Sequence, residues 1–166
     1  IKFVVKLLGA TIFQVEGFSE EKYLKDQLIS FNSKTLQNDK EKFVNLIFDK
    51  NIKKFRIKGS SNNGEASIDN IIGNWWNHKI LQVDSQISPI SGSIKEQVVT
   101  FIRKEKIEQY GTIHNVSRFT LKSKDMSLSK EKRLDFNIWY DEKNFRIIKI
   151  SYSKMGNWEY RLKSFE

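Results

Sequence analysis

The chain contains no cysteine, a single proline and no long run of apolar residues. The absence of cysteine excludes disulfides and thiolate metal sites, so packing alone must stabilise the fold. Apolar runs such as Val4-Val5 and Ile71-Ile72 are interrupted within a few residues, whereas a membrane-spanning helix needs ~20 apolar residues. We therefore expect no membrane span. A chain without cysteine is indifferent to an oxidising compartment, but this does not establish the compartment.

Sequence motifs of catalysis are also absent. We find no Gly-rich phosphate loop, no nucleophile elbow and no paired-carboxylate motif. The two histidines, His78 and His114, have no partners at a recognisable metal-site spacing, and a structural role is the favoured interpretation for both. We therefore expect no enzymatic activity, with no catalytic residue, no metal and no cofactor.

Lysine is the main source of a basic excess. The chain has 29 basic and 20 acidic residues, a net charge of +9 at pH 7. Counted by type, there are 23 Lys, 6 Arg, 20 Ile and 13 Asn, a bias typical of an AT-rich coding sequence. Proteins that bind nucleic acid rely more on arginine, which makes bidentate contacts. Nucleic acid is therefore not an expected partner.

Alternation of apolar and polar residues with a period of two dominates the last third of the chain. Within the segment 133–140 the apolar residues share one face: Leu134, Phe136, Ile138 and Tyr140. This pattern predicts a half-buried strand. Polar turns at 141–144 and 154–157 then divide the region into three antiparallel strands.

The same pattern extends over the rest of the chain and predicts an all-β fold. Short strands and regular turns favour one antiparallel domain over residues 1–166, a strongly curved sheet or an incomplete β-barrel. The polar run 32–39 is expected to be a turn. One short helix is expected, capped by Ser67 or Asp69 and extending to Asn77. Because the chain begins with Ile and not Met, we expect its native N-terminal segment to be missing.

Asn74-Trp75-Trp76-Asn77 is the most unusual tetrapeptide. Its tryptophans either plug one end of the sheet or form a lip or anchor for a ligand or partner, and the plug is the favoured interpretation. Adjacent side chains point in different directions in a strand and in a helix, so we expect one of the two rings to be buried. The candidate ligand- or partner-binding residues are Trp75, Trp76, Asn77, Trp139 and Trp158.

Short motifs of the chain resemble those of one family. Glu21-Lys-Tyr-Leu-Lys-Asp-Gln-Leu28 resembles a Glu-x-Trp/Tyr-x-x-Asp/Gly-x-Leu stretch, and Thr35-Leu-Gln-Asn38 resembles the Thr-Asn-x-Asn turn that follows it. Asn74-Trp-Trp-Asn77 is similar to an aromatic-Trp-Asn element, and Ile138-Trp-Tyr-Asp141 to a Trp-Tyr-Asp strand end. In this order they resemble an uncharacterised family of secreted bacterial β-proteins, a domain of unknown function. The resemblance implies a periplasmic or otherwise extracytoplasmic β-sheet protein without known catalysis, and it supplies no site residues.

A sheet of this size that curves on itself encloses either side chains or a cavity. The chain has 12 Phe and 4 Trp residues that can line it. We therefore expect a non-enzymatic envelope protein that binds an apolar or lipidic ligand, or an envelope protein partner, on its concave face. The alternatives are a structural subunit docked through an edge strand and a polyanion-binding protein that uses its basic face.

Overall fold

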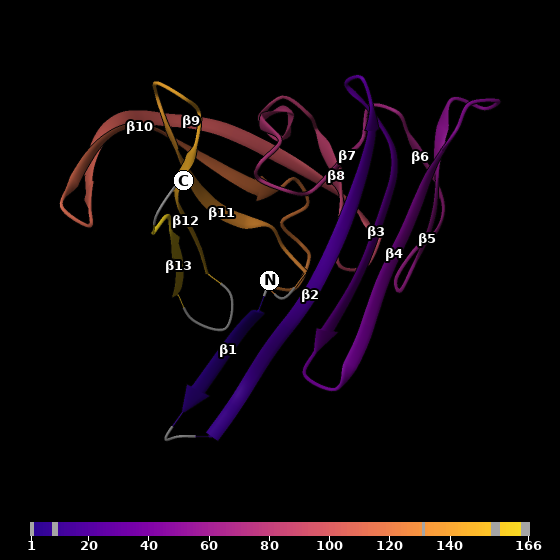
Figure 1. Cartoon of the computed structure of the whole chain (residues 1–166), viewed down its shortest axis with the longest axis horizontal. Coiled ribbons are helices and arrows are strands. Elements are labelled where there is room, and N and C mark those ends of the chain that lie inside the picture. Colours follow the sequence, from indigo (N-terminus) through magenta and orange to yellow (C-terminus); the bar gives the residue numbers. More distant parts are fainter. Residues whose placement is uncertain (1, 8–9, 131, 154–156, 164–166) are drawn as a thin grey trace. The chain divides into compact units, whose positions relative to one another are not determined.

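The computed structural model describes residues 2–7, 10–130, 132–153 and 157–163, with the backbone alone for 2–7, 10–13, 153, 157 and 158. Their strands form two sheets (Figure 1). The first sheet has the order β1 (Lys2–Leu7), β2 (Ala10–Leu24), β3 (Gln27–Gln37), β4 (Lys40–Asp49), β5 (Lys54–Gly59), β6 (Asn63–Ser67). The second has the order β13 (Asn157–Arg161), β12 (Ile147–Ser153), β11 (Asp135–Asp141), β10 (Thr112–Ser123), β9 (Ile94–Gln109), β8 (Ser85–Ile87), β7 (Ile71–Ile72).

The architecture confirms the predicted all-β fold with a strongly curved sheet. Neighbouring strands of the first sheet run antiparallel, as do β9 to β13 of the second. The long strands β9 and β10 bend strongly, and the second sheet curls into a half-barrel (Figure 1). The meander predicted from the last third of the chain is present as β11, β12 and β13. The turn predicted at 154–157 includes residues 154–156, which lie outside the described residues.

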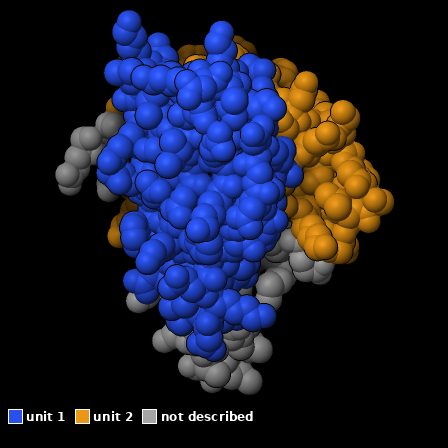
Figure 2. Space-filling view, turned by 90° about the vertical axis from the view of Figure 1, so that its right-hand side faces the viewer, with its two compact units in different colours: residues 1–73, 87–94 blue, residues 74–86, 95–166 orange. Residues whose placement is uncertain are grey.

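The chain divides into two compact units (Figure 2). Unit 1 comprises residues 1–73 and 87–94, and unit 2 comprises residues 74–86 and 95–166. The chain therefore passes between the units at 73–74, 86–87 and 94–95. Whether residues 1–166 act as the single domain expected from the sequence stays a prediction.

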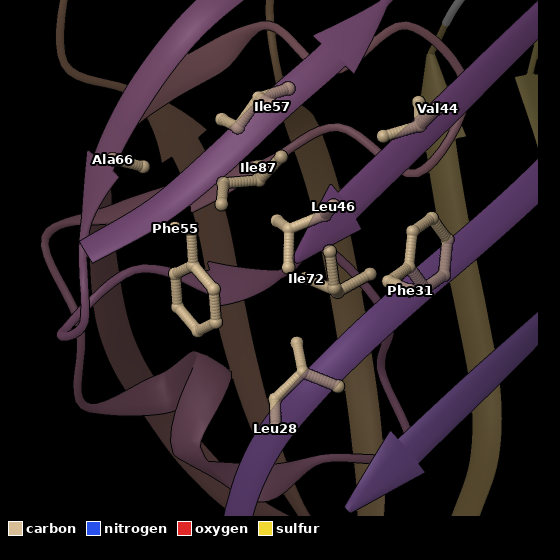
Figure 3. Packing of buried hydrophobic residues seen from close by; sticks show 9 residues of the cluster. All are labelled: Leu28, Phe31, Val44, Leu46, Phe55, Ile57, Ala66, Ile72 and Ile87. Carbon is tan, nitrogen blue, oxygen red and sulfur yellow. The ribbon is translucent and has the colours of Figure 1, made fainter. Parts of the chain in front are cut away.

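The core of unit 1 lies on one face of the first sheet (Figure 3). Alternation produces this face: in β5, Phe55 and Ile57 are buried, while Arg56 between them is exposed. Phe48 packs against the core and meets Phe55 edge to face, with ring centroids 5.8 Å apart. The buried side chains come from β3 to β8 and point toward one another: Leu28, Phe31, Val44, Leu46, Phe55, Ile57, Ala66, Ile72 and Ile87.

The helix predicted between Ser67 and Asn77 is wrong in position. Residues 71–72 form β7, and the Gly73 N–H donates a 2.8 Å hydrogen bond to the Ile87 carbonyl, so this segment joins the sheet. A short apolar run such as Ile71-Ile72 fits a helix and a strand equally well, so the sequence pattern does not distinguish them.

The helical turn begins just after the predicted segment. It is a 3₁₀ helix, η1 (His78–Leu81), the only helical element among the described residues. The Asn77 side chain accepts a 3.1 Å hydrogen bond from the Lys79 N–H and caps it. Asparagine is a preferred residue at helix N-termini, so Asn77 begins this turn and does not end an earlier one.

The polar run 32–39 is mostly strand, and the predicted turn is confined to Asn38 and Asp39. Ser33 and Thr35 are buried in β3, and Ser33 Oγ donates a 2.5 Å hydrogen bond to the carbonyl of Pro89. Buried hydroxyl groups need hydrogen-bond partners, and the loop that contains Pro89 supplies one for Ser33. Polar composition alone therefore gave the wrong prediction here.

The loop 88–93 crosses the end of β5 above Gly59. A Cβ atom at Gly59 would lie 2.6 Å from the carbonyl oxygen of Ser91, closer than side chains tolerate. The loop is fixed in this place, because the Ser61 N–H donates a 2.9 Å hydrogen bond to the Ser91 carbonyl and Asn62 Nδ2 donates one to the next residue of the loop. Glycine is required at position 59 by this close approach.

Gly59→Ala is expected to lower the free energy of unfolding by about 1–3 kcal/mol, because the added methyl group displaces a hydrogen-bonded loop. Chemical denaturation measures this change. Gly64→Ala is the control, since its Cβ would meet only the Asn62 side chain, at 3.7 Å. Equal losses of unfolding free energy in the two variants would contradict the requirement for glycine at position 59.

Candidate functional site: the aromatic face of the second sheet

The strands β9 to β13 present two faces of different chemistry. We call one the aromatic face, defined by Phe101, Phe119, Phe136, Ile138, Tyr140, Ile150, Tyr152 and Tyr160. We call the other the polar face, whose directly opposed cross-strand residues are Arg103, Arg118, Trp139, Lys149 and Arg161. Successive residues of β11 alternate between them, since Ile138 and Tyr140 belong to the aromatic face and Trp139 to the polar face.

The rings of the aromatic face contact one another across the strands. The centroid distances are 5.5 Å for Phe101–Phe119, 6.2 Å for Phe119–Tyr140, 5.5 Å for Phe136–Tyr152 and 6.2 Å for Tyr152–Tyr160. The centre of this face is buried at Ile138 and Tyr140, whereas its margins are open, with Phe101 52% and Tyr160 39% exposed. Apolar ring surface is therefore accessible on both sides of a closed centre.

The segment 74–83 lies against the centre of the aromatic face. Tyr140 Oη donates a 2.8 Å hydrogen bond to the Trp75 carbonyl, and the Trp75 ring meets Phe136 edge to face at 5.2 Å. The His78 ring meets Tyr140 in the same way at 5.1 Å. Burial raises the pKa of Tyr140 above its ordinary value, so its hydroxyl stays protonated and remains a donor.

Gln97 fixes the same segment to β9. Its Nε2 donates hydrogen bonds to the carbonyls of Ile80, at 2.8 Å, and Val83, at 2.9 Å, and its Oε1 accepts one from Gln86 Nε2 at 2.6 Å. Gln97, Gln86 and Ile80 are buried. Buried amides with satisfied donors and acceptors hold a segment in one arrangement. The segment 74–83, which covers the centre of the aromatic face, is therefore an ordered part of unit 2.

The two adjacent tryptophans lie in different environments. Trp75 is half-buried against Phe136, whereas Trp76 is 73% exposed. Asn77 is half-buried and caps η1, and its N–H donates a 3.0 Å hydrogen bond to Asn74 Oδ1. This geometry fits the plug interpretation for Trp75, and a ligand or partner role for Trp76 stays a prediction.

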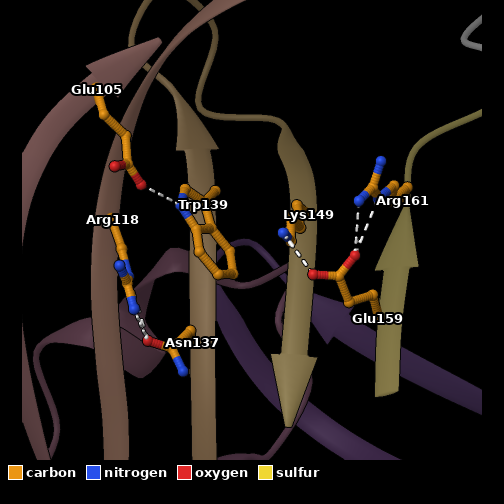
Figure 4. A network of polar contacts seen from close by, with 7 residues as sticks. All are labelled: Glu105, Arg118, Asn137, Trp139, Lys149, Glu159 and Arg161. Atoms are coloured by element: carbon orange, nitrogen blue, oxygen red, sulfur yellow. Dashed lines mark hydrogen bonds and ion pairs between the residues drawn. The ribbon is translucent and has the colours of Figure 1, made fainter. Parts of the chain in front are cut away.

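Trp139 is buried on the polar face under charged side chains (Figure 4). Its Nε1 donates a 2.6 Å hydrogen bond to Glu105 Oε1. The Arg118 guanidinium lies 5.0 Å from the ring centroid and the Lys149 ammonium 4.7 Å. These cations come from the strands on either side of β11, and both interact with the π system of the indole. The arrangement leaves little of the ring open to a ligand.

Carboxylates complete the polar network around Trp139. Glu105 pairs with Arg103 at 2.6 Å, and Glu159 pairs with Lys149 at 2.5 Å and Arg161 at 2.7 Å (Figure 4 shows the Glu159 pairs). The indole N–H, followed by Arg103, lowers the pKa of Glu105 below its ordinary value; Lys149, followed by Arg161, does the same for Glu159. The network therefore keeps both carboxylates ionised, and it pairs them with Arg103, Lys149 and Arg161 of the polar face.

Trp158 lies in β13, where its backbone pairs with that of Tyr152. Its side chain is outside the described part of the chain. The predicted residues Trp75, Trp76, Asn77 and Trp139 all belong to unit 2, but they do not form one site, because Trp75 packs on the aromatic face and Trp139 lies on the polar face. Sequence reasoning missed Phe101, Phe119 and Tyr160, although each stands at alternate positions in an apolar strand pattern that could have indicated them.

The described residues contain no group of His, Asp or Glu side chains suited to hold a metal ion. None of the helical structure in the described residues is long and apolar enough to cross a membrane.

A family model described as Domain of unknown function (DUF6134) matches residues 1–163. Neither the comparison with curated proteins nor the comparison with solved structures finds a match. The family likeness therefore covers nearly the whole chain and carries no activity with it.

Proposed function

The chain belongs to the DUF6134 family, which has no assigned activity, and from its own geometry we propose that it binds an apolar or lipidic ligand on the aromatic face without catalysing a reaction. The observation that carries this proposal is the pair of open margins at Phe101 and Tyr160. Ring surface that stays open at the margins of an aromatic face whose centre is buried is a candidate interaction site. We place this binding outside the cytoplasm, in the cell envelope, on the resemblance of the sequence motifs to secreted β-proteins.

The aromatic face is suited to binding because it is already organised. Its rings stand on paired strands and contact one another, so a ligand does not have to order them, and this preorganisation favours affinity. A long apolar ligand would cover ring surface at the margins and release the water there. The centre would remain occupied by the segment 74–83, which confines the ligand to Phe101, Tyr160 and their neighbours.

Phe145 adds a further exposed ring beside this face. Its φ is +56°, a conformation that bulky side chains rarely adopt. The Phe145 N–H donates a 2.9 Å hydrogen bond to the Asp141 carbonyl, and its ring lies 5.7 Å from that of His78. The turn between β11 and β12 therefore holds an exposed ring against His78, which itself contacts Tyr140 of the aromatic face.

The polar face supports the polyanion alternative less well. The polar face carries several basic side chains, but Lys149 and Arg161 are paired with Glu159, and Arg118 donates a 2.7 Å hydrogen bond to Asn137 Oδ1. A polyanion would have to replace these contacts before it gained its own.

Binding of a fluorescent long-chain fatty acid tests the proposal. Phe101→Glu and Tyr160→Glu are each expected to weaken binding at least tenfold. The new carboxylate costs several kcal/mol to desolvate under an apolar ligand, and the apolar contact of the ring is lost. Tyr110→Ser is the control, since Tyr110 is exposed at the turn between β9 and β10. Unchanged affinity in both Glu variants, with unchanged melting temperatures, would contradict the proposed site.

Native mass spectrometry of the protein purified from its own host gives an independent measurement. We expect a lipid-sized added mass that is reduced in Phe101→Glu. An added mass that belongs to a protein partner would instead favour the alternative of an assembly subunit.

A further inference from the structure

The turns at one end of the first sheet carry exposed apolar side chains. Successive antiparallel strands reverse direction, so the β2–β3 turn, the β4–β5 turn and the turn after β6 lie at the same end of the sheet, at the top in Figure 1. Leu24 is 60% exposed there, Ile52 40% and Ile68 39%. We call this the apolar end.

At the opposite end of the same sheet two connections are described, and both are polar: Asn38-Asp39 between β3 and β4, and Ser60-Ser61-Asn62 between β5 and β6. Turns favour Asn, Asp, Ser and Gly, whose side chains or backbone freedom suit the turn conformation. Isoleucine has no such advantage in a turn, and packing leaves 40% of Ile52 and 39% of Ile68 exposed. The apolar end is therefore a candidate interaction surface.

The turns of the apolar end are held in defined conformations. In the β4–β5 turn, Asp49 Oδ1 accepts a 2.9 Å hydrogen bond from the Asn51 N–H, and Asp49 Oδ2 accepts one of 2.7 Å from Arg56 Nε. In the turn after β6, the Asn70 N–H donates a 3.0 Å hydrogen bond to the Ser67 carbonyl. Ile52 and Ile68 are thus presented by organised turns.

Lysines flank the apolar side chains. Lys25, Lys50 and Lys53 form no ion pair among the described residues. Asp49 is paired with Arg56, so its charge is already offset locally. The remaining turn carboxylates are Asp26 and Asp69, and Asp69 accepts a 3.0 Å hydrogen bond from Ser67 Oγ. The local charge is therefore positive, as is the net charge of the whole chain, +9.

We propose that the apolar end of unit 1 docks onto the surface of an anionic lipid bilayer. Leu24, Ile52 and Ile68 enter the head-group region, and the lysines reach the lipid phosphates while their stems lie along apolar surface. This pairing of apolar tips with lysines complements a negatively charged interface. The inference rests on unit 1 alone and does not depend on ligand binding by the aromatic face of unit 2.

Co-sedimentation with vesicles tests the docking surface. Wild-type protein is expected to bind vesicles of phosphatidylglycerol and phosphatidylcholine several-fold more tightly than vesicles of phosphatidylcholine alone. Lys50→Glu with Lys53→Glu should weaken binding to the anionic vesicles by roughly fivefold or more for each lysine replaced. Leu24→Ser with Ile52→Ser should weaken it by roughly tenfold or more, because apolar surface no longer leaves water.

Matched variants separate this surface from others on the chain. Phe18→Ser removes an apolar side chain that is 69% exposed within β2, away from the turns, and should leave vesicle binding unchanged. Binding that falls as much in Phe18→Ser as in the Leu24/Ile52 variant would overturn the proposal. Absence of binding to anionic vesicles would overturn it too, and so would self-association that the Leu24/Ile52 variant abolishes without any vesicle binding.

Because the chain has no cysteine, a single introduced cysteine can carry a dye that reports contact with the vesicle at one position, without a variant that weakens binding. Leu24→Cys and Phe18→Cys can each carry one environment-sensitive dye, because the chain has no other thiol. Anionic vesicles are expected to shift the emission of the dye at position 24 and leave that at position 18 unchanged. Equal shifts at both positions, or none at position 24, would overturn the proposal.

Discussion

Replacing Trp139 with alanine is expected to lower the free energy of unfolding by about 3–5 kcal/mol, the range for removing a buried tryptophan. The variant loses the buried indole, the hydrogen bond to Glu105 and the interactions with Arg118 and Lys149. Chemical denaturation measures the change. Trp139→Phe is the matched variant: it keeps an aromatic ring between the two cations and removes the N–H, and a loss of about 1–2 kcal/mol is expected.

The same pair of variants has a predicted pH dependence. The indole N–H is the largest cause of the lowered pKa of Glu105. A carboxyl whose pKa is lower in the folded state stabilises the fold above its unfolded pKa, and this contribution is lost as the pH falls through the folded pKa. Wild type should therefore lose more stability than Trp139→Phe on acidification through this range. NMR titration should show a higher Glu105 pKa in Trp139→Phe, and an unchanged pKa would contradict the role of the indole.

Trp75→Ala and Trp76→Ala are expected to differ sharply although the residues are adjacent. Trp75 is half-buried on Phe136, so its removal should cost about 2–4 kcal/mol of unfolding free energy, somewhat less than for a fully buried ring. Trp76 is exposed, and its removal should change stability by less than about 0.5 kcal/mol. Thermal unfolding of both variants decides the matter. Equal large losses would remove any case for a binding role of Trp76, and equal negligible losses would mean that Trp75 is no plug.

Alternation in the sequence was sufficient to predict the strands of the last third, but not the burial of Trp139. The pattern placed its neighbours Asp135 and Asn137 on the outward face, and Trp139 shares that face. Its burial arises from Arg118 and Lys149 on the neighbouring strands. Which residues stand opposite one another depends on strand register, and no local pattern in one strand specifies the register of the next.

The aromatic face could be predicted only in part for the same reason. Period-two alternation puts Phe119 and Leu121 on one side of β10, and Phe136 and Ile138 on one side of β11. The contact between Phe119 and Tyr140, however, exists because of how these strands pair. The position of the segment 74–83 could not be predicted from its own residues either, since the buried amides of Gln86 and Gln97 fix it.

The division into two units left no trace in composition. A boundary between domains is usually sought as a flexible linker rich in Gly, Pro or polar residues. Here the chain passes between the units at three places, and the crossing at 86–87 falls within β8. A boundary inside a strand has the composition of a strand.

This interleaving has a consequence for the order in which the protein is made. Ile87 belongs to the core of unit 1, so a ribosome must release the chain beyond this residue before that core can close. By then the segment 74–83 has already emerged, while its partners Gln97, Phe136 and Tyr140 have not. Trp75 and Ile80 therefore stay without these partners for part of translation, and their apolar side chains are exposed to aggregation during that time.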